Sequence, residues 1–423
     1  MRLTTPISTS YVGCSMPRSS RHQRGRSPDQ QRDEGVHHLR LPKFLEAELK
    51  AGHPWVYRNH IPSNFSAATG AWVKAQAGET SVWGLWDSES QLALRIYSVR
   101  GPLDMADIVE RIQRALRLRR ALLSPDTNAF RLINGEGDGL PGIVVDVYGP
   151  FAVVATYGAA VQVIVLPVVE ALRQLLSPAG IVLRRMTGDE SGNAPIEWVR
   201  GEPPLDDFYI TEQGTRFFAD LTRGHKTGLY LDQRKNRRTF AQFARGGSLL
   251  NLYAYTGGFS VVAALAGARR VTSVDIAEPA LARARDNFVL NGLDPAEHQF
   301  IAQDCYEYLR ATASGQAQFD AIVCDPPSMA RNRAQLEDAL KAYLRINMLG
   351  LRLVRDGGFY AASSCTAQVS PEAFRKVLAQ AAQRAGRRAQ IVHESGHAWD
   401  HPVNLGHPEG RYLKFLVMRV VDE

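Results

Sequence analysis

From about residue 245 onward, short apolar runs alternate with longer segments of helical periodicity. The runs are LLNLYAY, VTSVDI, HQFIAQD, FDAIVCD and GGFYAASS, followed near the C-terminus by AQIVHES and YLKFLVMRVV. A strand, a helix and a second parallel strand connect through a right-handed crossover, and repeats of this unit bury a sheet between two layers of helices. The alternation therefore predicts a doubly wound α/β domain with a parallel sheet, which we place at residues 208–423.

Three regions precede this domain in a chain of 423 residues, a length that predicts two or three domains. Residues 1–37 are rich in Ser, Arg, Gln and Pro and are predicted to form a disordered basic extension. Residues 38–103 hold short runs rich in Val, Trp and Tyr, which predict a small β-rich module. Residues 104–207 begin with an amphipathic helix and continue as strand, helix and strand, so we expect a connector helix and an α+β middle domain.

Charge and cysteine content narrow the class of protein. The net charge of +7 favours a polyanionic partner. The four cysteines include no C-x-x-C pair, which argues against a zinc site or a disulfide framework and predicts a reduced, cytoplasmic setting. No apolar run approaches the roughly 18 residues that a membrane span needs. We therefore expect a soluble protein without a metal or a membrane partner, and the sequence leaves a homodimer open.

Glycine and acidic residues follow the predicted parallel strands, at the edge where such folds bind ligands. Gly257 and Gly258 stand in the turn after the first strand, where glycine lets a ligand approach the backbone closely. Asp275 ends the second strand, and a carboxylate there can accept hydrogen bonds from ribose hydroxyls. Asp304 and Asp325 end the third and fourth strands. Each acid alone could be a helix cap, but the series predicts a nucleoside site, and the incomplete G-x-G-x-x-G pattern disfavours a nicotinamide enzyme.

These motifs carry a family resemblance. NLYAYTGGFS, VDIAEPAL, AQDC and CDPPSM resemble motifs I to IV of class I S-adenosylmethionine-dependent methyltransferases. From about residue 38 to the C-terminus, the chain is similar to the bacterial 23S rRNA cytosine-C5 methyltransferases often called RlmI-like, through HPWVY, GHKTGLYLDQR at 224–234, SSCT and DHPV…HPEGRYLK. The resemblance implies a PUA RNA-binding domain, a middle domain and a Rossmann-like seven-stranded methyltransferase domain. Ser328 departs from it, because family members commonly carry Lys there.

The resemblance also implies S-adenosylmethionine as the cofactor and RNA, in particular 23S rRNA, as the partner. It implies that Asp275 holds the ribose and Asp304 the adenine edge, while Asn251 and Gly257 hold the methionine end. The remaining cofactor candidates are Tyr253, Thr256, Gly258 and Gln233, the last equally open to a structural role in its loop.

A lone cysteine, Cys365, stands where the fifth strand meets its loop. Carbon 5 of cytosine is a poor nucleophile, and a thiolate that adds to carbon 6 raises its electron density; loss of the carbon-5 proton after methylation then expels the thiolate. A cysteine is often simply a core residue, but this chemistry and the resemblance favour Cys365 as the nucleophile. Cys305 and Cys324 also flank the site, and for them we expect packing roles.

Asp325 is the second catalytic candidate. The cysteine adduct places negative charge toward N3 and O2 of the ring, so a donor must face that edge. A protonated Asp325 would donate to N3, provided that a desolvated pocket favours the acid form. We expect Asp325 and Cys365 to converge on one base because their strands are adjacent.

Two other functions remain as alternatives. Methylation of a guanine or adenine nitrogen would use a D-P-P loop but needs no cysteine. A non-catalytic RNA-binding ribosome assembly factor needs neither, although acids at every predicted cofactor position argue against it. The sequence leaves undetermined which nucleotide is methylated and whether the substrate is free rRNA or an assembled subunit.

Overall fold

The computed structural model describes residues 36–186, 195–222, 224, 227–313, 318–330 and 332–422. Residues 1–35 of the predicted N-terminal extension, with Cys14, lie outside this range, as do Arg223, His225 and Lys226 of the segment around the GHKTG motif. From His37 onward, contacts join the chain into one unit that contains three main sheets.

The first sheet confirms the predicted β-rich module. It has five strands in the order β1-β3-β4-β5-β2 and a short helix, α2 (Glu46–Lys50). Its strands are β1 (His37–Arg40), β2 (Trp55–Tyr57), β3 (Trp72–Ala77), β4 (Thr80–Trp86) and β5 (Leu92–Ser98). Alternating burial along β3 directs one face of this sheet into its own hydrophobic cluster.

The predicted connector helix is α3 (Met105–Leu122). Asp104 caps its N-terminus by accepting a hydrogen bond from the backbone N–H of Asp107 at 2.8 Å, and the Asp107 side chain accepts in return from the Asp104 N–H. This reciprocal capping satisfies two donors that helix geometry leaves unpaired. Ile108 and Ile112 bury the apolar stripe of the helix, which explains why helical periodicity predicted it correctly.

The middle sheet has five strands in the order β10-β9-β8-β7-β6. Helix α4 (Val165–Leu176) connects the parallel strands β8 and β9, as the sequence predicts. The strands are β6 (Ala129–Asn134), β7 (Ile143–Tyr148), β8 (Phe151–Tyr157), β9 (Gly180–Met186) and β10 (Ile196–Arg200). The edge strand β10 was not predicted, because it is mostly exposed or half-buried and lacks an apolar run.

Two further elements lie before the C-terminal sheet and were also not predicted. A hairpin forms from β11 (Tyr209–Glu212) and β12 (Thr215–Phe218), followed by helix α5 (Arg234–Ala241). The sequence of α5, RKNRRTFA, carries little apolar periodicity, yet Arg234 and Arg237 are buried because each pairs with a buried acid. A hydrophobic pattern in the sequence does not indicate that paired charges are buried.

The C-terminal sheet has seven strands in the order β15-β14-β13-β16-β17-β19-β18, which confirms the predicted seven-stranded α/β domain. Its strands are β13 (Ser248–Leu252), β14 (Arg270–Asp275), β15 (Gln299–Ala302), β16 (Phe319–Cys324), β17 (Val354–Ser364), β18 (Arg387–Ser395) and β19 (Lys414–Asp422). Its helices are α6 (Gly258–Leu265), α7 (Glu278–Leu290), α8 (Cys305–Ala313), α9 (Leu336–Arg352) and α10 (Pro371–Ala385).

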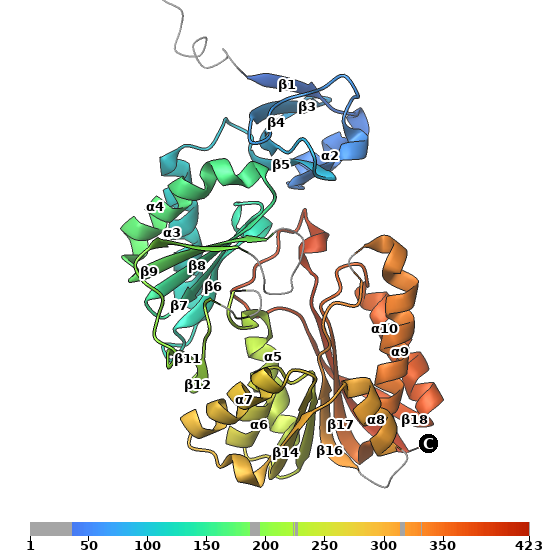
Figure 1. The fold of residues 1–423 in the computed structure, drawn as a ribbon. Helices are drawn as coiled ribbons and strands as arrows, with labels where there is room; N and C mark the ends of the chain where they lie inside the picture. The colour runs from blue at the N-terminus through green and yellow to red at the C-terminus, as the bar shows by residue number, and fades with distance from the viewer. Residues whose placement is uncertain are drawn as a thin grey trace, which may run out of the picture. The chain divides into compact units, whose positions relative to one another are not determined.

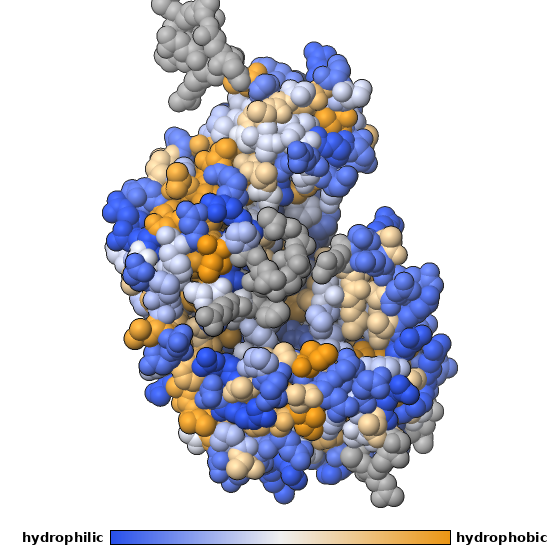
Figure 2. Space-filling view, viewed as in Figure 1, coloured by the Kyte–Doolittle hydropathy of each residue, from blue (hydrophilic) through white to orange (hydrophobic). Residues whose placement is uncertain are grey.

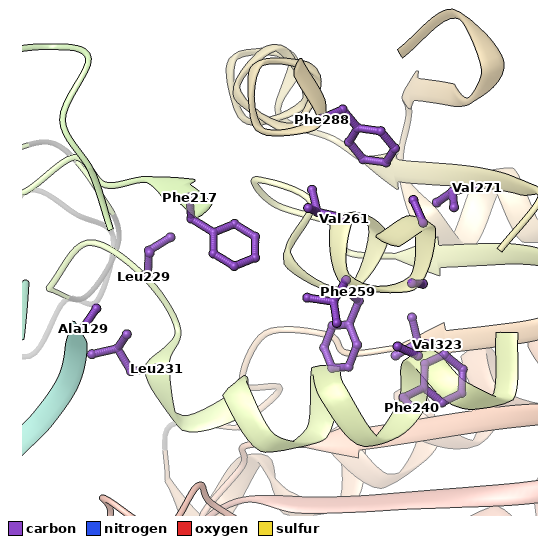
Figure 3. Close-up of a cluster of buried hydrophobic side chains, with 14 of the residues drawn as sticks. Ala129, Phe217, Leu229, Leu231, Phe240, Phe259, Val261, Val271, Phe288 and Val323 are labelled. Carbon is purple, nitrogen blue, oxygen red and sulfur yellow. The ribbon is translucent and has the colours of Figure 1, made fainter. Parts of the chain in front are cut away.

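Alternate residues of these strands face opposite helix layers, because side chains alternate along a strand. Leu249 and Val323 belong to the cluster with α5, α6 and α7, whereas Leu250 and Ile322 belong to the cluster with α8, α9 and α10. Figure 1 shows these two groups of helices on opposite sides of the sheet. The first cluster also contains Ala129 of the middle sheet, so the middle and C-terminal regions share core (Figure 3). The predicted boundaries at residues 37, 103 and 207 stay predictions.

One strand departs from the predicted parallel arrangement. β19 runs antiparallel to both of its neighbours, β17 and β18. The segment that connects β18 to β19 contains only a one-turn 3-10 helix, Pro408–Gly410, and therefore lacks the crossover helix that a parallel connection requires.

The outer helix faces are polar. On the face that Figure 2 shows, hydrophilic side chains predominate over the region of α9 and α10. Within the part of the chain that the structure describes, no helix combines the length and apolar character needed to cross a membrane.

Candidate active site

The carboxyl ends of five parallel strands bring most of the predicted site residues to one edge of the C-terminal sheet. Strands β13, β14, β15, β16 and β17 are all parallel to their neighbours within this set. Asp275 is the last residue of β14, and Asp325 directly follows β16. Cys365 directly follows β17, and Asp304 comes two residues after β15. The register of the sheet therefore places the four side chains at a single edge.

The loop that follows β13 has an unusual backbone. Tyr253, Tyr255 and Gly257 have φ values of 59°, 48° and 78°, in the left-handed region. Non-glycine residues rarely adopt this conformation, and such residues cluster at ligand-binding sites. Gly257 cannot easily be replaced, because a Cβ there would lie 2.9 Å from the Cβ of Ala284. The loop thus curls tightly before α6 begins at Gly258.

Asp275 holds this loop in place. One carboxylate oxygen accepts a hydrogen bond from the backbone N–H of Tyr255 at 2.8 Å, and the other accepts from the N–H of Ala277 at 2.9 Å. A carboxylate has about four acceptor sites, so these two bonds leave acceptor capacity on both oxygens. The half-buried Asp275 is therefore able to bind two neighbouring hydroxyl groups without releasing the loop.

Asp304 caps α8. Its Oδ1 accepts hydrogen bonds from the backbone N–H groups of Tyr306 and Glu307 at 2.9 and 3.0 Å. Capping of α8 therefore uses one oxygen of Asp304. The side chain is exposed, and its Oδ2 stays available at the same edge of the sheet as Asp275.

Asn251 lies deeper than the sequence alone indicates. Its side chain is 1% exposed, and its Nδ2 donates to Ser260 Oγ at 2.8 Å. Ser260 Oγ in turn lies 2.7 Å from Ser273 Oγ. Asn251 Oδ1 is buried without a hydrogen-bond partner among the described residues. The side chain therefore ties β13 to α6 and β14 beneath the loop.

A pocket opens beside the same loop. Tyr255 and Thr256 line it from one side, and Asp220, Thr222 and Gly228 line it from the segment around the GHKTG motif. The Thr256 carbonyl accepts a hydrogen bond from Asn287 of α7 at 2.9 Å, which fixes the loop against that helix.

The GHKTGLYLDQR segment is anchored at several points. Thr227 donates to Asp146 of the middle sheet at 2.6 Å, and Asp232 accepts from the Tyr412 hydroxyl at 2.7 Å. Leu229 and Leu231 enter the shared core (Figure 3). These anchors place Gln233, the next residue after Asp232, at the end of the sheet.

Gln233 connects the two strand ends that carry the catalytic candidates. Its Nε2 donates to Asp325 Oδ1 at 2.9 Å and to Ser363 Oγ at 2.9 Å. Its Oε1 accepts from Asn236 Nδ2 at 2.6 Å. Both N–H groups of this buried amide are therefore bonded to protein partners, and contact between Gln233 and the cofactor stays a prediction.

Cys365 differs from the other two described cysteines. Its side chain is half-buried, and its Sγ lies 4.0 Å from the carbonyl oxygen of Pro326, the residue after Asp325. Cys305 and Cys324 are buried in the core on the α8–α10 side. Burial raises the pKa of the Cys305 thiol to about 12 and raises that of Cys324 further. Both buried cysteines are therefore neutral thiols at physiological pH.

Thr366 links the Cys365 loop to the loop after β16 and was not predicted. Its Oγ1 accepts from the backbone N–H of Met329 at 3.0 Å and lies 2.9 Å from the Tyr343 hydroxyl. Ser328, where the resemblance leads one to expect Lys, is exposed and donates to the Ala330 carbonyl at 3.2 Å. The bond between Met329 and Thr366 joins the two loops.

Lys414 was also missed. It begins β19 with only 4% of its surface exposed, and its Nζ donates to the carbonyls of Thr366 and Tyr412 at 2.7 and 2.8 Å. A lysine within the apolar run YLKFLVM was a signal in the sequence, because lysine is almost never buried without a partner.

The DHPV motif joins the C-terminal region to the middle sheet. Asp400 Oδ2 lies 2.6 Å from Arg234 and accepts from the backbone N–H of Arg131 at 2.9 Å. Burial acts to raise the pKa of Asp400, but His401 and Arg234 outweigh it and hold the pKa well below its usual range. The motif therefore has a structural role beside α5.

Comparison with known proteins supplies the family. The family of S-adenosylmethionine-dependent methyltransferases matches residues 179–390, and a PUA-like domain matches residues 39–99. A ribosomal RNA large subunit methyltransferase I from Shewanella denitrificans is 37% identical over 90% of this chain and 99% of its own length. The protein of the same name from Klebsiella pneumoniae is 35% identical over 90% of this chain and 98% of its own length.

Solved structures share the fold. A candidate S-adenosylmethionine-dependent methyltransferase from Streptococcus mutans has a TM-score of 0.80 and 25% identity, over 90% of this chain and 100% of that chain. A candidate methyltransferase complexed with SAH has a TM-score of 0.80 and 24% identity with the same coverage. The chain therefore belongs to the S-adenosylmethionine-dependent methyltransferase family, in the group that includes the relatives named ribosomal RNA large subunit methyltransferase I, and S-adenosylmethionine is its cofactor.

Proposed function

We propose that the chain methylates carbon 5 of a cytosine in RNA, with 23S rRNA as the substrate, through a covalent adduct to Cys365. The observation that carries this proposal is the half-buried Cys365 thiol beside Pro326, at the same edge of the sheet as Asp325. Methylation of a purine nitrogen needs no such thiol. The relatives are named ribosomal RNA large subunit methyltransferase I, and this name supports rRNA as the substrate.

The loop after β13 and the neighbouring acids fit the cofactor. In this proposal the two oxygens of Asp275 accept from the ribose hydroxyls, and Asp304 faces the adenine. Tyr253, Thr256 and Gly257 surround the methionine end, which the left-handed turns of the loop support. Asn251 acts from β13, beneath the loop, and Gly258 acts from the start of α6. When bound, S-adenosylmethionine supplies an electrophilic methyl group.

Replacement of Asp275 tests this cofactor site. Asp275→Ala is expected to weaken S-adenosylmethionine binding by about 1.5–3 kcal/mol, the range for hydrogen bonds to a charged group. This corresponds to a rise in Kd of roughly ten- to 150-fold in calorimetry. Asp294→Ala is the matched control, because Asp294 also accepts a backbone N–H two residues on but lies before β15 rather than after a parallel strand. Equal affinity of both folded variants would remove Asp275 from the site.

The reacting base is held between the ends of β16 and β17. The Cys365 thiolate adds to carbon 6, and Asp325 in its acid form donates to N3 of the ring, where the adduct places negative charge. Gln233 positions Asp325 by bonding it and Ser363 together. After carbon 5 has accepted the methyl group, it loses its proton to solvent. The bond between sulfur and carbon 6 then breaks, its electron pair returns to sulfur, and the aromatic ring is restored.

The PUA-like domain and the net charge of +7 suit a positioning role on RNA. Contacts to phosphates release counterions, so RNA binding is expected to weaken with a steep log-log dependence on salt. The cytoplasmic setting and a homodimer stay predictions of the sequence.

The substrate is tested on rRNA from a strain that lacks the protein. Incubation of that rRNA with the enzyme and labelled S-adenosylmethionine is expected to yield 5-methylcytidine in 23S rRNA, identified by mass spectrometry of nucleosides and of mapped fragments. A methylated guanine or adenine would replace the proposal with nitrogen methylation. Absence of any methylation, on free rRNA and on ribosomal subunits alike, would favour a non-catalytic assembly factor.

A further inference from the structure

Lys414 lies beside the proposed nucleophile in the structure. Strands β17 and β19 pair with Lys414 opposite Ser364, the residue before Cys365. The Lys414 Nζ donates to the carbonyl of Thr366, the residue after Cys365, at 2.7 Å. The backbone of Lys414 therefore pairs with the residue before the cysteine, and its ammonium group bonds the residue after the cysteine.

The hydrogen bonds of Lys414 leave one donor uncommitted. An ammonium group has three N–H donors. Two of them bond the carbonyls of Thr366 and Tyr412, at 2.7 and 2.8 Å. These partners are neutral, and the structure places no ion-paired carboxylate on Lys414 among the described residues. A buried charge without a counter-charge costs several kcal/mol.

Titratable groups on two neighbouring elements lie near Cys365. Asp325 lies on the loop after β16, and Tyr343 lies on α9. Tyr343 interacts electrostatically with both Cys365 and Asp325. Burial raises the pKa of Tyr343, so this phenol stays neutral at physiological pH. Cys365 is the charged partner that acts on Lys414 itself. The thiol is thus the group that can supply the missing counter-charge.

We propose that the Lys414 ammonium group pairs with the Cys365 thiolate and so keeps the proposed nucleophile ionised at neutral pH. This inference rests on the proposed function, and Lys414 acts in it as a positioning residue. The thiol proton leaves to solvent, and Lys414 keeps its own protons throughout. The sulfur lone pair forms the bond to carbon 6, and when that bond breaks the electron pair returns to sulfur, again beside the ammonium group.

Burial sets the pH range of this pairing, because it opposes the charged form of Lys414. Desolvation lowers the pKa of Lys414 to about 8, while the charge of Cys365 acts in the opposite direction. Below this pKa Lys414 is charged and stabilises the thiolate. As the pH rises through it, Lys414 loses its proton and the thiolate loses its partner.

The test measures the ionisation of Cys365 directly, without RNA or cofactor. The full-length protein is treated with iodoacetamide at a series of pH values, and the rate of alkylation at Cys365 is followed by peptide mass spectrometry. Since the thiolate is the reactive form, Lys414→Met is expected to slow alkylation at neutral pH by roughly tenfold or more and to shift the rate profile to higher pH. Lys414→Arg, which keeps the charge, is expected to retain most of the reactivity.

Lys414→Gln separates charge from hydrogen bonding, because its amide can still donate to a carbonyl. Slow alkylation in Lys414→Gln supports the ion pair, whereas a wild-type rate profile in Lys414→Gln or Lys414→Met would overturn it. If these variants fail to fold, the ultraviolet thiolate absorbance of the wild type is compared with that of Cys365→Ser. A thiolate signal at neutral pH supports the pair, and its absence excludes it. Failure of cytosine methylation leaves these readouts unchanged, so the two proposals fail separately.

Discussion

Cys365→Ala is expected to abolish methylation of carbon 5 while cofactor binding remains. The other two described cysteines, Cys305 and Cys324, are buried and un-ionised, so neither is expected to add to carbon 6 in its place. The residues proposed to hold the cofactor lie on the loops after β13, β14 and β15 and are untouched. Methyl transfer to rRNA and calorimetric binding of S-adenosylmethionine measure the two effects separately.

A covalent complex with a fluorinated RNA tests the role of Cys365 directly. With 5-fluorocytidine at the target position, fluorine cannot leave as a cation, so the wild-type enzyme is expected to remain bonded to RNA through denaturing electrophoresis. Cys365→Ala is expected to give no such complex. Cys305→Ala and Cys324→Ala serve as matched controls and are expected to be trapped, because their thiols lie in the core. Full methyl transfer by Cys365→Ala would favour nitrogen methylation, and trapping that depends on Cys324 would reassign the nucleophile.

Asp400→Ala is expected to lower the free energy of unfolding by several kcal/mol. Asp400 is fully buried, and its removal leaves the 5% exposed side chain of Arg234 without its carboxylate. It also removes the acceptor of the Arg131 backbone N–H. Breaking a buried pair in this way costs about 3–5 kcal/mol, which denaturant unfolding monitored by circular dichroism can measure. Asp338→Ala is the control, because the Asp338 side chain is 86% exposed and its pair with Lys341 should matter little.

The same carboxylate predicts a dependence on pH. The pKa of Asp400 is lowered in the folded protein, so the unfolded state binds the proton more tightly. Its contribution to the free energy of unfolding is therefore fully present above the ordinary aspartate pKa of about 4 and is lost as the pH falls through the folded value. The difference in stability between wild type and Asp400→Ala should shrink on acidification below that point. A difference independent of pH would show that Asp400 acts through packing alone.

Local patterns in the sequence determined the main architecture. The apolar runs of β13, β14, β16 and β17 are buried on both faces, and each is short enough to be distinguished from a helix by length and flanking residues. Because parallel strands share one carboxyl edge, the positions of Asp275, Asp325 and Cys365 at strand ends predicted that they would lie together. Among the elements that were not predicted, β10 has few buried apolar residues, and α5 buries arginines that pair with acids.

Only the tertiary structure decided which distant residues support that edge. Gln233 bonds Asp325 and Ser363, which lie 92 and 130 positions further along the chain. Lys414 reaches the Cys365 loop because β19 inserts antiparallel between β17 and β18, an order that no periodicity encodes. The hydrophobic pattern of a segment indicates whether that segment is buried and which face of a strand points into the core. The partner of a buried polar group depends on the order in which strands and loops pack, and this order is a property of the whole chain.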